Sequence, residues 1–168
     1  QEMNFKIILT GNRMNEALVY QAHYTKSDPI LNYMTGMLDF HPHDSILEPC
    51  GGYGEFVDKI LEKNPKANIC VFELNPKAVL GLKDKYRGEE NIQIKETDTL
   101  LDKSITSCSI RFDKIIGNPP YGARNDDKKK GLLNKLYADL YTKESYTLFL
   151  YACTRCLNEN GELSFIIP

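Results

Sequence analysis

The segment Asn118-Pro119-Pro120-Tyr121 holds the residue types in this chain best suited to carry out a reaction. An aromatic amine is a poor nucleophile because its lone pair is delocalised into the ring. Two hydrogen-bond acceptors on its hydrogens would draw the nitrogen toward tetrahedral geometry, and the Asn118 side-chain oxygen and a rigid backbone carbonyl can supply them. The prolines fix the backbone, and Tyr121 offers a flat face on which a base can stack. The segment predicts transfer to a planar nitrogen, although in isolation it also fits an ordinary Asn-Pro turn.

A glycine-rich turn precedes this segment, in Glu48-Pro49-Cys50-Gly51-Gly52-Tyr53-Gly54-Glu55-Phe56. Three glycines after a short apolar run let the backbone turn sharply and let a ligand approach it closely. A helix is expected next, and its first N–H groups would face the ligand. Val57 stands where a dinucleotide fingerprint has its third glycine, so the turn favours a nucleotide-like ligand but also fits a plain strand-to-helix connection.

Two acidic side chains follow the next two apolar runs. Glu73 lies about twenty residues beyond the glycines, where a carboxylate can accept hydrogen bonds from ribose hydroxyls. Asp98, between Thr97 and Thr99, could accept from the amine of a bound adenine. Either residue could instead cap a local turn or helix. Together with the glycine turn they predict a cofactor that carries adenosine, without separating a nicotinamide dinucleotide from S-adenosylmethionine.

These residues need a scaffold that brings several loops together, and the hydrophobic pattern predicts one. Apolar runs indicate strands at 45–49, 68–74, 91–97, 112–117 and 162–168, and helical spacing indicates helices at 28–39, 55–63, 76–86, 132–141 and 144–157. Residues 5–9 fit a strand or a helix, and 126–131 is expected to be a charged loop. Alternating strands and helices predict an α/β fold with a doubly wound, mainly parallel sheet. Such sheets bind ligands at the carboxyl ends of their strands.

Composition narrows the class of protein. The chain has 168 residues, 42% hydrophobic and 26% charged, with a formal net charge of −2. The length and composition are typical of one folded domain. The negative net charge counts against a free-standing DNA-binding module, which usually has a basic face. No apolar run of about 18 residues and no signal peptide is visible. Five cysteines are expected to be buried, reduced thiols of a cytoplasmic protein, and the Cys153-x-x-Cys156 pair has no partners for a metal site.

With these motifs in order, residues 20–168 resemble the gamma class of adenine-specific DNA methyltransferases, in which the cofactor motifs precede the catalytic motif. Glu48-Pro49-x-x-Gly52-x-Gly54-x-Phe56 is similar to the first cofactor motif of that family, and Asn118-Pro119-Pro120-Tyr121 to its catalytic motif. Tyr24-Thr25-Lys26 resembles the upstream cofactor-contacting segment, with Lys26 replacing a proline. Tyr146, Leu148 and Phe149 resemble the helix that shapes the cofactor pocket.

The resemblance implies a Rossmann-like core that binds S-adenosylmethionine and methylates the exocyclic N6 amine of adenine. The implied catalytic residues, which would hold the flipped base, are Asn118, Pro119, Pro120 and Tyr121. The implied cofactor-binding residues are Tyr24, Thr25, Glu48, Pro49, Cys50, Gly52, Gly54, Phe56, Glu73, Leu74, Asp98, Thr99 and Asn118.

It also implies an N-terminal segment at 1–40 and a catalytic core at 41–168. Because relatives continue beyond the point that corresponds to Pro168, we expect a truncated core, incomplete at the C-terminal end of its sheet, with weak or absent DNA methylation alone. Double-stranded DNA would bind through a target-recognition region that this sequence lacks, and a fused or partner restriction nuclease is a possible companion.

Other interpretations stay open at this point. Asn-Pro-Pro-Tyr also occurs in methyltransferases that act on glutamine in release factors or on RNA. A nicotinamide oxidoreductase would need a proton donor near a strand end, whereas His23, His41 and His43 all precede the first assigned strand. The third alternative interpretation is a binding module without catalytic activity. Lys128-Lys129-Lys130 fits a solvated loop better than a phosphate contact, and the tyrosines at 137, 141, 146 and 151 have the helical spacing of packing residues.

Overall fold

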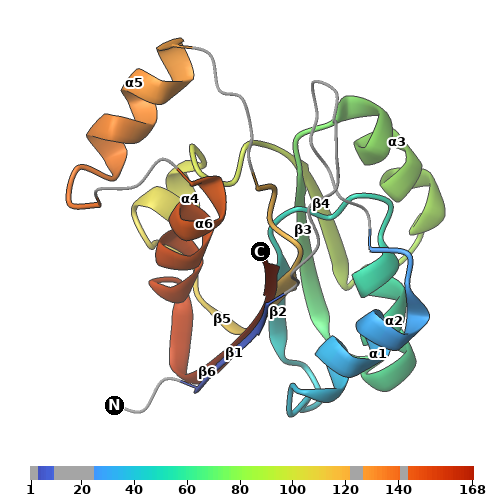
Figure 1. Ribbon diagram of the computed structural model, residues 1–168. Helices are drawn as coiled ribbons and strands as arrows, with labels where there is room; N and C mark the ends of the chain where they lie inside the picture. The colour runs from blue at the N-terminus through green and yellow to red at the C-terminus, as the bar shows by residue number, and fades with distance from the viewer. Residues whose placement is uncertain (1–3, 10–24, 122–126, 141–143) are drawn as a thin grey trace.

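A computed structural model of the chain describes residues 4–9, 25–121, 127–140 and 144–168, with only the backbone course described at 4–9. The strands are β1 (Asn4–Leu9), β2 (Ser45–Glu48), β3 (Asn68–Glu73), β4 (Ile92–Glu96), β5 (Phe112–Gly117) and β6 (Leu157–Ile167). The helices are α1 (Asp28–Gly36), α2 (Glu55–Lys63), α3 (Pro76–Lys85), α4 (Lys103–Thr106), α5 (Asp127–Leu136) and α6 (Ser145–Thr154). The strands form one sheet in the order β1-β6-β5-β2-β3-β4, and every adjacent pair is parallel (Figure 1).

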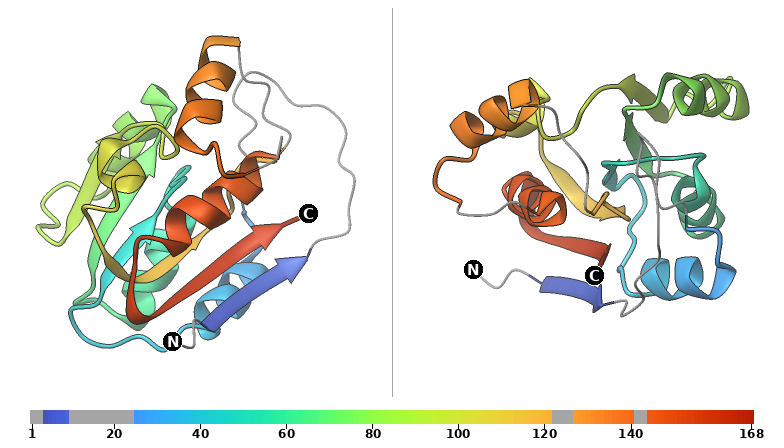
Figure 2. Two further views of the ribbon diagram at one scale, coloured as in Figure 1. Left: turned by 90° about the vertical axis from the view of Figure 1, so that its left-hand side faces the viewer. Right: turned by 45° about the horizontal axis from the view of Figure 1, so that its top comes forward.

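Helices cover both faces of this sheet, with α1, α2 and α3 on one side and α4, α5 and α6 on the other (Figures 1 and 2). Successive strand residues point to opposite faces, so Ile46 packs under the first helix group and Leu47 under the second. Ile116 and Ile115 on β5 repeat the same division. Continuous apolar runs therefore form these strands because both faces are buried, which confirms the predicted doubly wound α/β fold.

The strand order reverses between β2 and β5. From β2 the chain winds outward through β3 to β4, then returns to place β5 on the other side of β2 and β6 beyond it. In open α/β sheets the crevice at this reversal, outside the carboxyl ends of the strands, is where ligands bind. The glycine-rich turn follows β2 and Asn118 follows β5, so the two strongest sequence motifs lie at this one place.

Four sequence-based assignments change in the structure. Residues 5–9, which fitted either a strand or a helix, belong to strand β1, which pairs with β6. The expected charged loop at 126–131 is wrong, because helix α5 begins at Asp127, where Lys130 forms an i,i+3 ion pair with that residue. The sequence missed the four-residue helix α4, which Asp102 caps by accepting a hydrogen bond from Ser104 N. Strand β6 begins at Leu157 rather than 162, with an irregularity in its pairing with β5.

The described residues before residue 40 belong to the same sheet and to the helix layer on the side of α2 and α3. β1 extends the sheet beside β6, and α1 packs against α2 and β6. Helix α1 begins at Asp28 with Ser27 in the cap position. The division at residue 40 stays a prediction.

All five cysteines are free, as predicted, although only Cys153 and Cys156 are fully buried. Tyr137 packs edge-on against Tyr151, in agreement with the packing role expected of these tyrosines. Tyr141 lies outside the described residues. No helix in the described part of the chain is long and apolar enough to cross a membrane.

A buried ion pair joins two neighbouring strands of the sheet. Lys114 on β5 and Glu162 on β6 are register partners, and Lys114 Nζ lies 3.0 Å from Glu162 Oε2. Their side chains are 7% and 10% exposed. Glu162 Oε2 also accepts a hydrogen bond from the backbone N of Asp39, at 2.8 Å. Glu162 therefore links the segment after α1 to strand β6. This strand lies next to β5, which Asn118 follows.

Candidate active site

The glycine turn after β2 can form only because particular side chains are absent. A Cβ on Gly51 would overlap Val71 Cγ1 on β3, and Gly51 N donates to Phe72 O at 2.9 Å. Gly54 has a φ of +87°, a left-handed conformation that side chains disfavour. The turn therefore lies tightly against β3 and delivers the chain into α2, as the sequence predicted.

Tyr86, at the end of α3, holds this turn from the other side. Its hydroxyl lies 2.9 Å from Gly54 O and 2.8 Å from Asp58 Oδ1. Burial, followed by the hydrogen bond with Asp58, raises the pKa of the phenol, so it keeps its proton. Sequence reasoning missed Tyr86, because nothing local links it to a turn 32 residues away.

Glu73 meets the turn directly at the end of β3. Its Oε2 accepts from Gly52 N at 2.7 Å, and its Oε1 accepts from Asn75 N at the same distance. The carboxylate is 8% exposed, and Glu73 is not the cap of the helix that follows, although its bond to Asn75 N does close a local turn. Asn75 is the cap of α3 and accepts from Lys77 N. Leu74 beside it is 48% exposed, an apolar surface at the carboxyl edge of the sheet.

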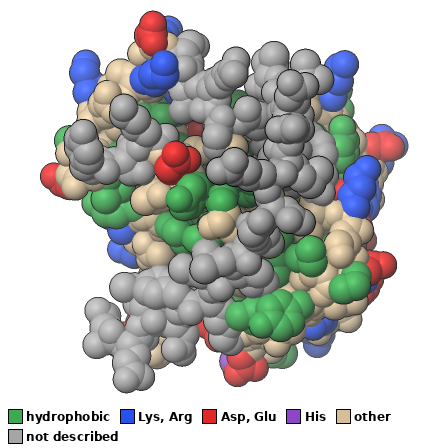
Figure 3. Space-filling model, in the orientation of Figure 1, with side chains coloured by type: hydrophobic (Ala, Val, Ile, Leu, Met, Phe, Trp, Pro, Cys, Tyr) green, Lys and Arg blue, Asp and Glu red, His purple; other side chains and the backbone are tan. Residues whose placement is uncertain are grey.

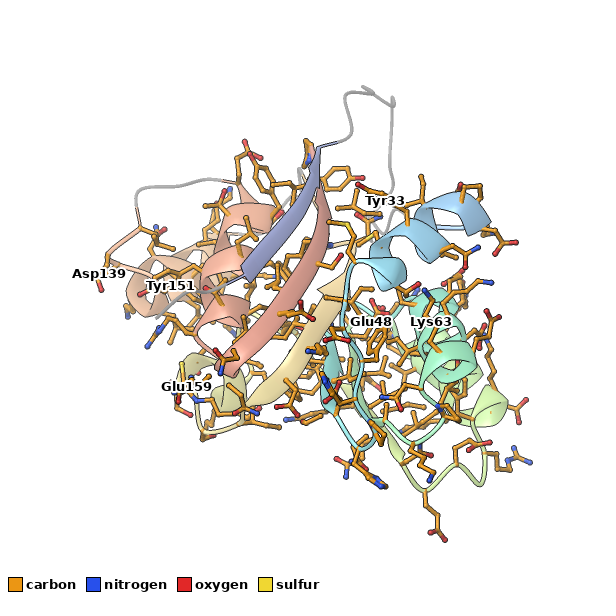
Figure 4. The ribbon with its side chains drawn as sticks, turned by 90° about the horizontal axis from the view of Figure 1, so that it is seen from below. Tyr33, Glu48, Lys63, Asp139, Tyr151 and Glu159 are labelled. Carbon is orange, nitrogen blue, oxygen red and sulfur yellow. The ribbon has the colours of Figure 1, made fainter. Side chains whose placement is uncertain are left out.

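Glu48 is the most enclosed of the predicted acidic site residues. It is 1% exposed, and its Oε2 has no hydrogen-bond partner among the described residues. Figure 4 shows it inside the molecule beside β2, whereas Asp139 and Glu159 stand at the rim. Burial, then the charges of Glu55 and Glu73, raises the pKa of Glu48 well above its ordinary value. Ionisation here is unfavourable until a cation arrives.

The end of β4 is fastened to the end of β2. Thr99 Oγ1 donates to Pro49 O at 2.5 Å, and Asp98 Oδ1 accepts from Leu100 N at 3.1 Å, so Asp98 does cap a local turn. Asp98 Oδ2 is also paired with Lys129 Nζ from α5, at 2.5 Å. Of the three consecutive lysines, Lys129 thus contacts a site residue, which the sequence did not predict.

The surface around α5 is basic at its outer side. Figure 3 shows Lys and Arg side chains at the upper left, over this helix. Lys128 and Lys130 are exposed there, and Lys130 pairs with Asp127. The structure does not test a phosphate contact by these lysines, which was the less favoured interpretation of the sequence.

Asn118 contacts three other parts of the chain at the end of β5. Its Nδ2 donates to Thr25 Oγ1 at 3.0 Å, and its side chain forms a hydrogen bond with the Tyr121 phenol. The backbone of Asn118 forms a hydrogen bond with the Cys50 thiol, whose pKa is raised by burial and then by Glu48 and Glu73. The loop is fixed further on, where Ser145 Oγ at the start of α6 donates to Pro120 O at 2.5 Å.

The remaining predicted residues divide between the site and the core. Phe56 is buried with the layer of α1, α2 and α3, and Leu148 and Phe149 belong to the layer on the opposite face, with Tyr146 packed against it. Their cofactor contacts stay predictions. Tyr24 lies outside the described residues. The described residues contain no group of three or more His, Cys, Asp or Glu side chains that could hold a metal ion.

The structure thus brings the predicted motifs to one edge of the sheet. The motifs lie at or just after the carboxyl ends of four adjacent strands, β5, β2, β3 and β4. They are Asn118 after β5, Glu48 and the glycine turn at the end of β2, Glu73 at the end of β3, and Asp98 after β4. The buried end of this site is acidic, with Glu48 beside Glu55 and Glu73. That charge suits a positively charged ligand, and the Asn118 loop supplies rigid polar atoms next to it.

Several known proteins are similar to this chain in sequence. Residues 52–168 match the model of a family described as Eco57I restriction-modification methylase. The modification methylase CviBIII of Paramecium bursaria Chlorella virus NC1A is 38% identical over 171 residues, which are 98% of this chain and 41% of the relative. A ribosomal RNA small subunit methyltransferase A of Prochlorococcus marinus is 30% identical over 99 residues, 59% of this chain and 35% of the relative.

A solved structure supports the fold. Coclaurine N-methyltransferase bound to N-methylheliamine and S-adenosylhomocysteine superimposes with a TM-score of 0.58 and 14% identity, covering 88% of this chain and 38% of that one. The fold is therefore that of the Rossmann-like methyltransferases. The chain spans less than half the length of the curated relatives described here.

Proposed function

Because the chain belongs to the Eco57I restriction-modification methylase family, we propose that it transfers a methyl group from S-adenosylmethionine to the exocyclic N6 amine of adenine in DNA. The observation that carries this proposal is the place of Asn118-Pro119-Pro120-Tyr121, at the end of β5 and beside the glycine turn after β2. Double-stranded DNA is the proposed partner, and a restriction nuclease, fused or separate, remains a prediction.

The Asn118 loop has the properties that methylation of an adenine amine requires. The Asn118 oxygen and the Pro119 carbonyl would accept the two amine hydrogens and free the nitrogen lone pair for attack. Pro119 and Pro120 stiffen the backbone, and the Ser145 contact fixes the loop on α6. Tyr121 would stack on an adenine turned out of the duplex. A nitrogen–carbon bond forms as the sulfur–carbon bond breaks, and the amine loses one proton to solvent.

The cofactor of this family fits the acidic end of the site. When bound, it supplies an electrophilic methyl group on a positively charged sulfur. The buried Glu48 Oε2, which has no hydrogen-bond partner among the described residues, would gain a cation nearby. Glu73 would accept from ribose hydroxyls while retaining its bonds to Gly52 N and Asn75 N, because each carboxylate oxygen has two lone pairs. Leu74 would gain cover for its exposed apolar surface.

Glu48→Gln is expected to stabilise the cofactor-free chain at neutral pH and to weaken cofactor binding. The folded pKa of Glu48 lies above the ordinary value of 4.5, so above pH 4.5 the unfolded chain releases a proton that the folded chain keeps. Stability is therefore lost as pH rises through this window up to the folded pKa. Glutamine stays neutral and avoids that loss, so the gain should grow with pH and vanish below about pH 4.

Thermal unfolding of both chains from pH 4 to pH 8 measures this effect. Glu62→Gln on the exposed side of α2 is the matched control and should leave the profile unchanged. Equal melting temperatures of the wild-type and Glu48→Gln chains across the whole range would show that Glu48 is not held protonated.

The direct test of the proposal supplies labelled cofactor with three acceptors: adenine-containing duplex DNA, ribosomal RNA and a release-factor protein. We expect slow incorporation of label into DNA, recovered as N6-methyladenine after digestion to nucleosides, because DNA methylation by the chain alone is expected to be weak. RNA is the second candidate acceptor, favoured by the similarity to ribosomal RNA methyltransferase A. Label found only in RNA or only in protein would refute methylation of DNA. Label recovered as a methylated cytosine would refute the adenine assignment.

A further inference from the structure

The side chain of Asn118 forms hydrogen bonds with Thr25 and with Tyr121. Nδ2 donates to Thr25 Oγ1 at 3.0 Å, across 93 residues of sequence. The same side chain forms a hydrogen bond with Tyr121, and this bond lowers the pKa of the phenol against the rise caused by burial.

The contact with Thr25 determines which end of the amide is available for chemistry. A primary amide has two donor hydrogens on nitrogen and an acceptor oxygen on the other side of the same carbon. With the nitrogen directed toward Thr25, the Oδ1 end points away from that hydroxyl. A reversed amide would present N–H donors to the adenine amine, which is itself a donor. Asn118 would then offer no acceptor to the hydrogens of that amine.

We propose that Thr25 is a positioning residue for methyl transfer, whose hydroxyl oxygen holds the Asn118 amide in the orientation that presents Oδ1 to the acceptor amine. This inference rests on the proposed function, because it assigns a direction to the Asn118 amide in that reaction. It differs from the cofactor contact that the family resemblance implies for Thr25. Threonine suits this role since its branched side chain is stiff about χ1, and the partly buried Thr25 lies just ahead of α1, which packs on α2 and β6.

The contact itself is testable in the full chain without any ligand. Thr25→Val keeps the shape of the side chain and removes its oxygen, and Thr25→Ser keeps the oxygen. In ¹⁵N–¹H spectra, Asn118→Asp identifies the side-chain amide signals by their loss. We expect one Asn118 amide proton to exchange with water more slowly than those of the exposed Asn134 in the wild type and in Thr25→Ser, and to lose that protection in Thr25→Val. Thr106→Val on α4 is the remote control and should change nothing.

A second readout separates positioning from cofactor contact. Thr25→Val should lower the rate of methyl transfer in a single turnover by about tenfold to a hundredfold, as expected for a misplaced catalytic group. Its cofactor affinity, measured by calorimetry, should stay within about twofold of the wild type because the cofactor-binding turns are untouched. Thr25→Ser should restore the rate.

Two results would overturn this inference. Unchanged protection of the Asn118 amide in Thr25→Val would show that Thr25 does not hold it. Weakened cofactor binding with an unchanged transfer rate would make Thr25 a cofactor contact alone. Failure of the proposed function is distinguishable, because a chain that methylates RNA or protein rather than DNA would still show the Thr25-dependent amide signal.

Discussion

Replacement of Asn118 by alanine is expected to slow methyl transfer to DNA by about 100- to 1,000-fold, the usual effect of removing one oriented polar group that acts on the reacting atoms. Alanine removes the acceptor oxygen and the donor to Thr25 but leaves the backbone of Pro119 and Pro120 in place. The glycine turn, Glu73 and Asp98 are fastened by their own hydrogen bonds, so cofactor affinity should change little. The measurement is methyl incorporation into duplex DNA with the chain in excess, together with calorimetry of cofactor binding.

Asn118→Asp is the matched variant for this experiment. A carboxylate keeps acceptor atoms at the same position but loses the donor that contacts Thr25. Its rate should fall between those of the wild type and Asn118→Ala. Wild-type rates in Asn118→Ala, or an equal loss of cofactor binding and transfer, would remove Asn118 from the catalytic role.

The largest effect on stability is expected from Lys114→Met. This change leaves Glu162 as a buried carboxylate without its cation, and breaking such a pair from one side typically costs about 3–5 kcal/mol. The backbone N–H of Asp39 offers Glu162 one hydrogen bond, which does not replace a full positive charge. The free energy of unfolding from urea titrations is the quantity to compare.

The double variant Lys114→Met with Glu162→Leu is the control, because it removes both charges and fills the space with apolar atoms. Such replacements are often neutral or stabilising, so the double variant should recover most of the loss. A single variant that loses less than about 1 kcal/mol, the scale of an exposed pair, would mean that the two charges are effectively solvated.

Much of the fold follows from local patterns that tertiary contacts did not override. The middle parts of β2, β3 and β5 are buried on both faces, so each strand contains consecutive apolar residues, and a run such as 69–72 is recognisable in the sequence for that reason. The glycines and Asn118 were recognisable because a tight turn after a strand tolerates few residue types. The charged start of α5 was not recognisable as a helix, because a run of lysines has the same appearance in a helix and in a loop. Its contact with the rest of the chain, the ion pair between Lys129 and Asp98, exists only in the tertiary structure.

The sequence alone determined the doubly wound class, the edge of the sheet where ligand binding is predicted, and the types of group present there: glycines, carboxylates, an asparagine and prolines. Only the tertiary structure decided how they meet. Thr25 contacts Asn118 across 93 residues, Tyr86 reaches Gly54, and Lys114 meets Glu162 in the sheet interior. Spacing along the chain carries the periodicity of helices and strands, whereas these contacts depend on the strand order and register, which form only when distant segments pack together.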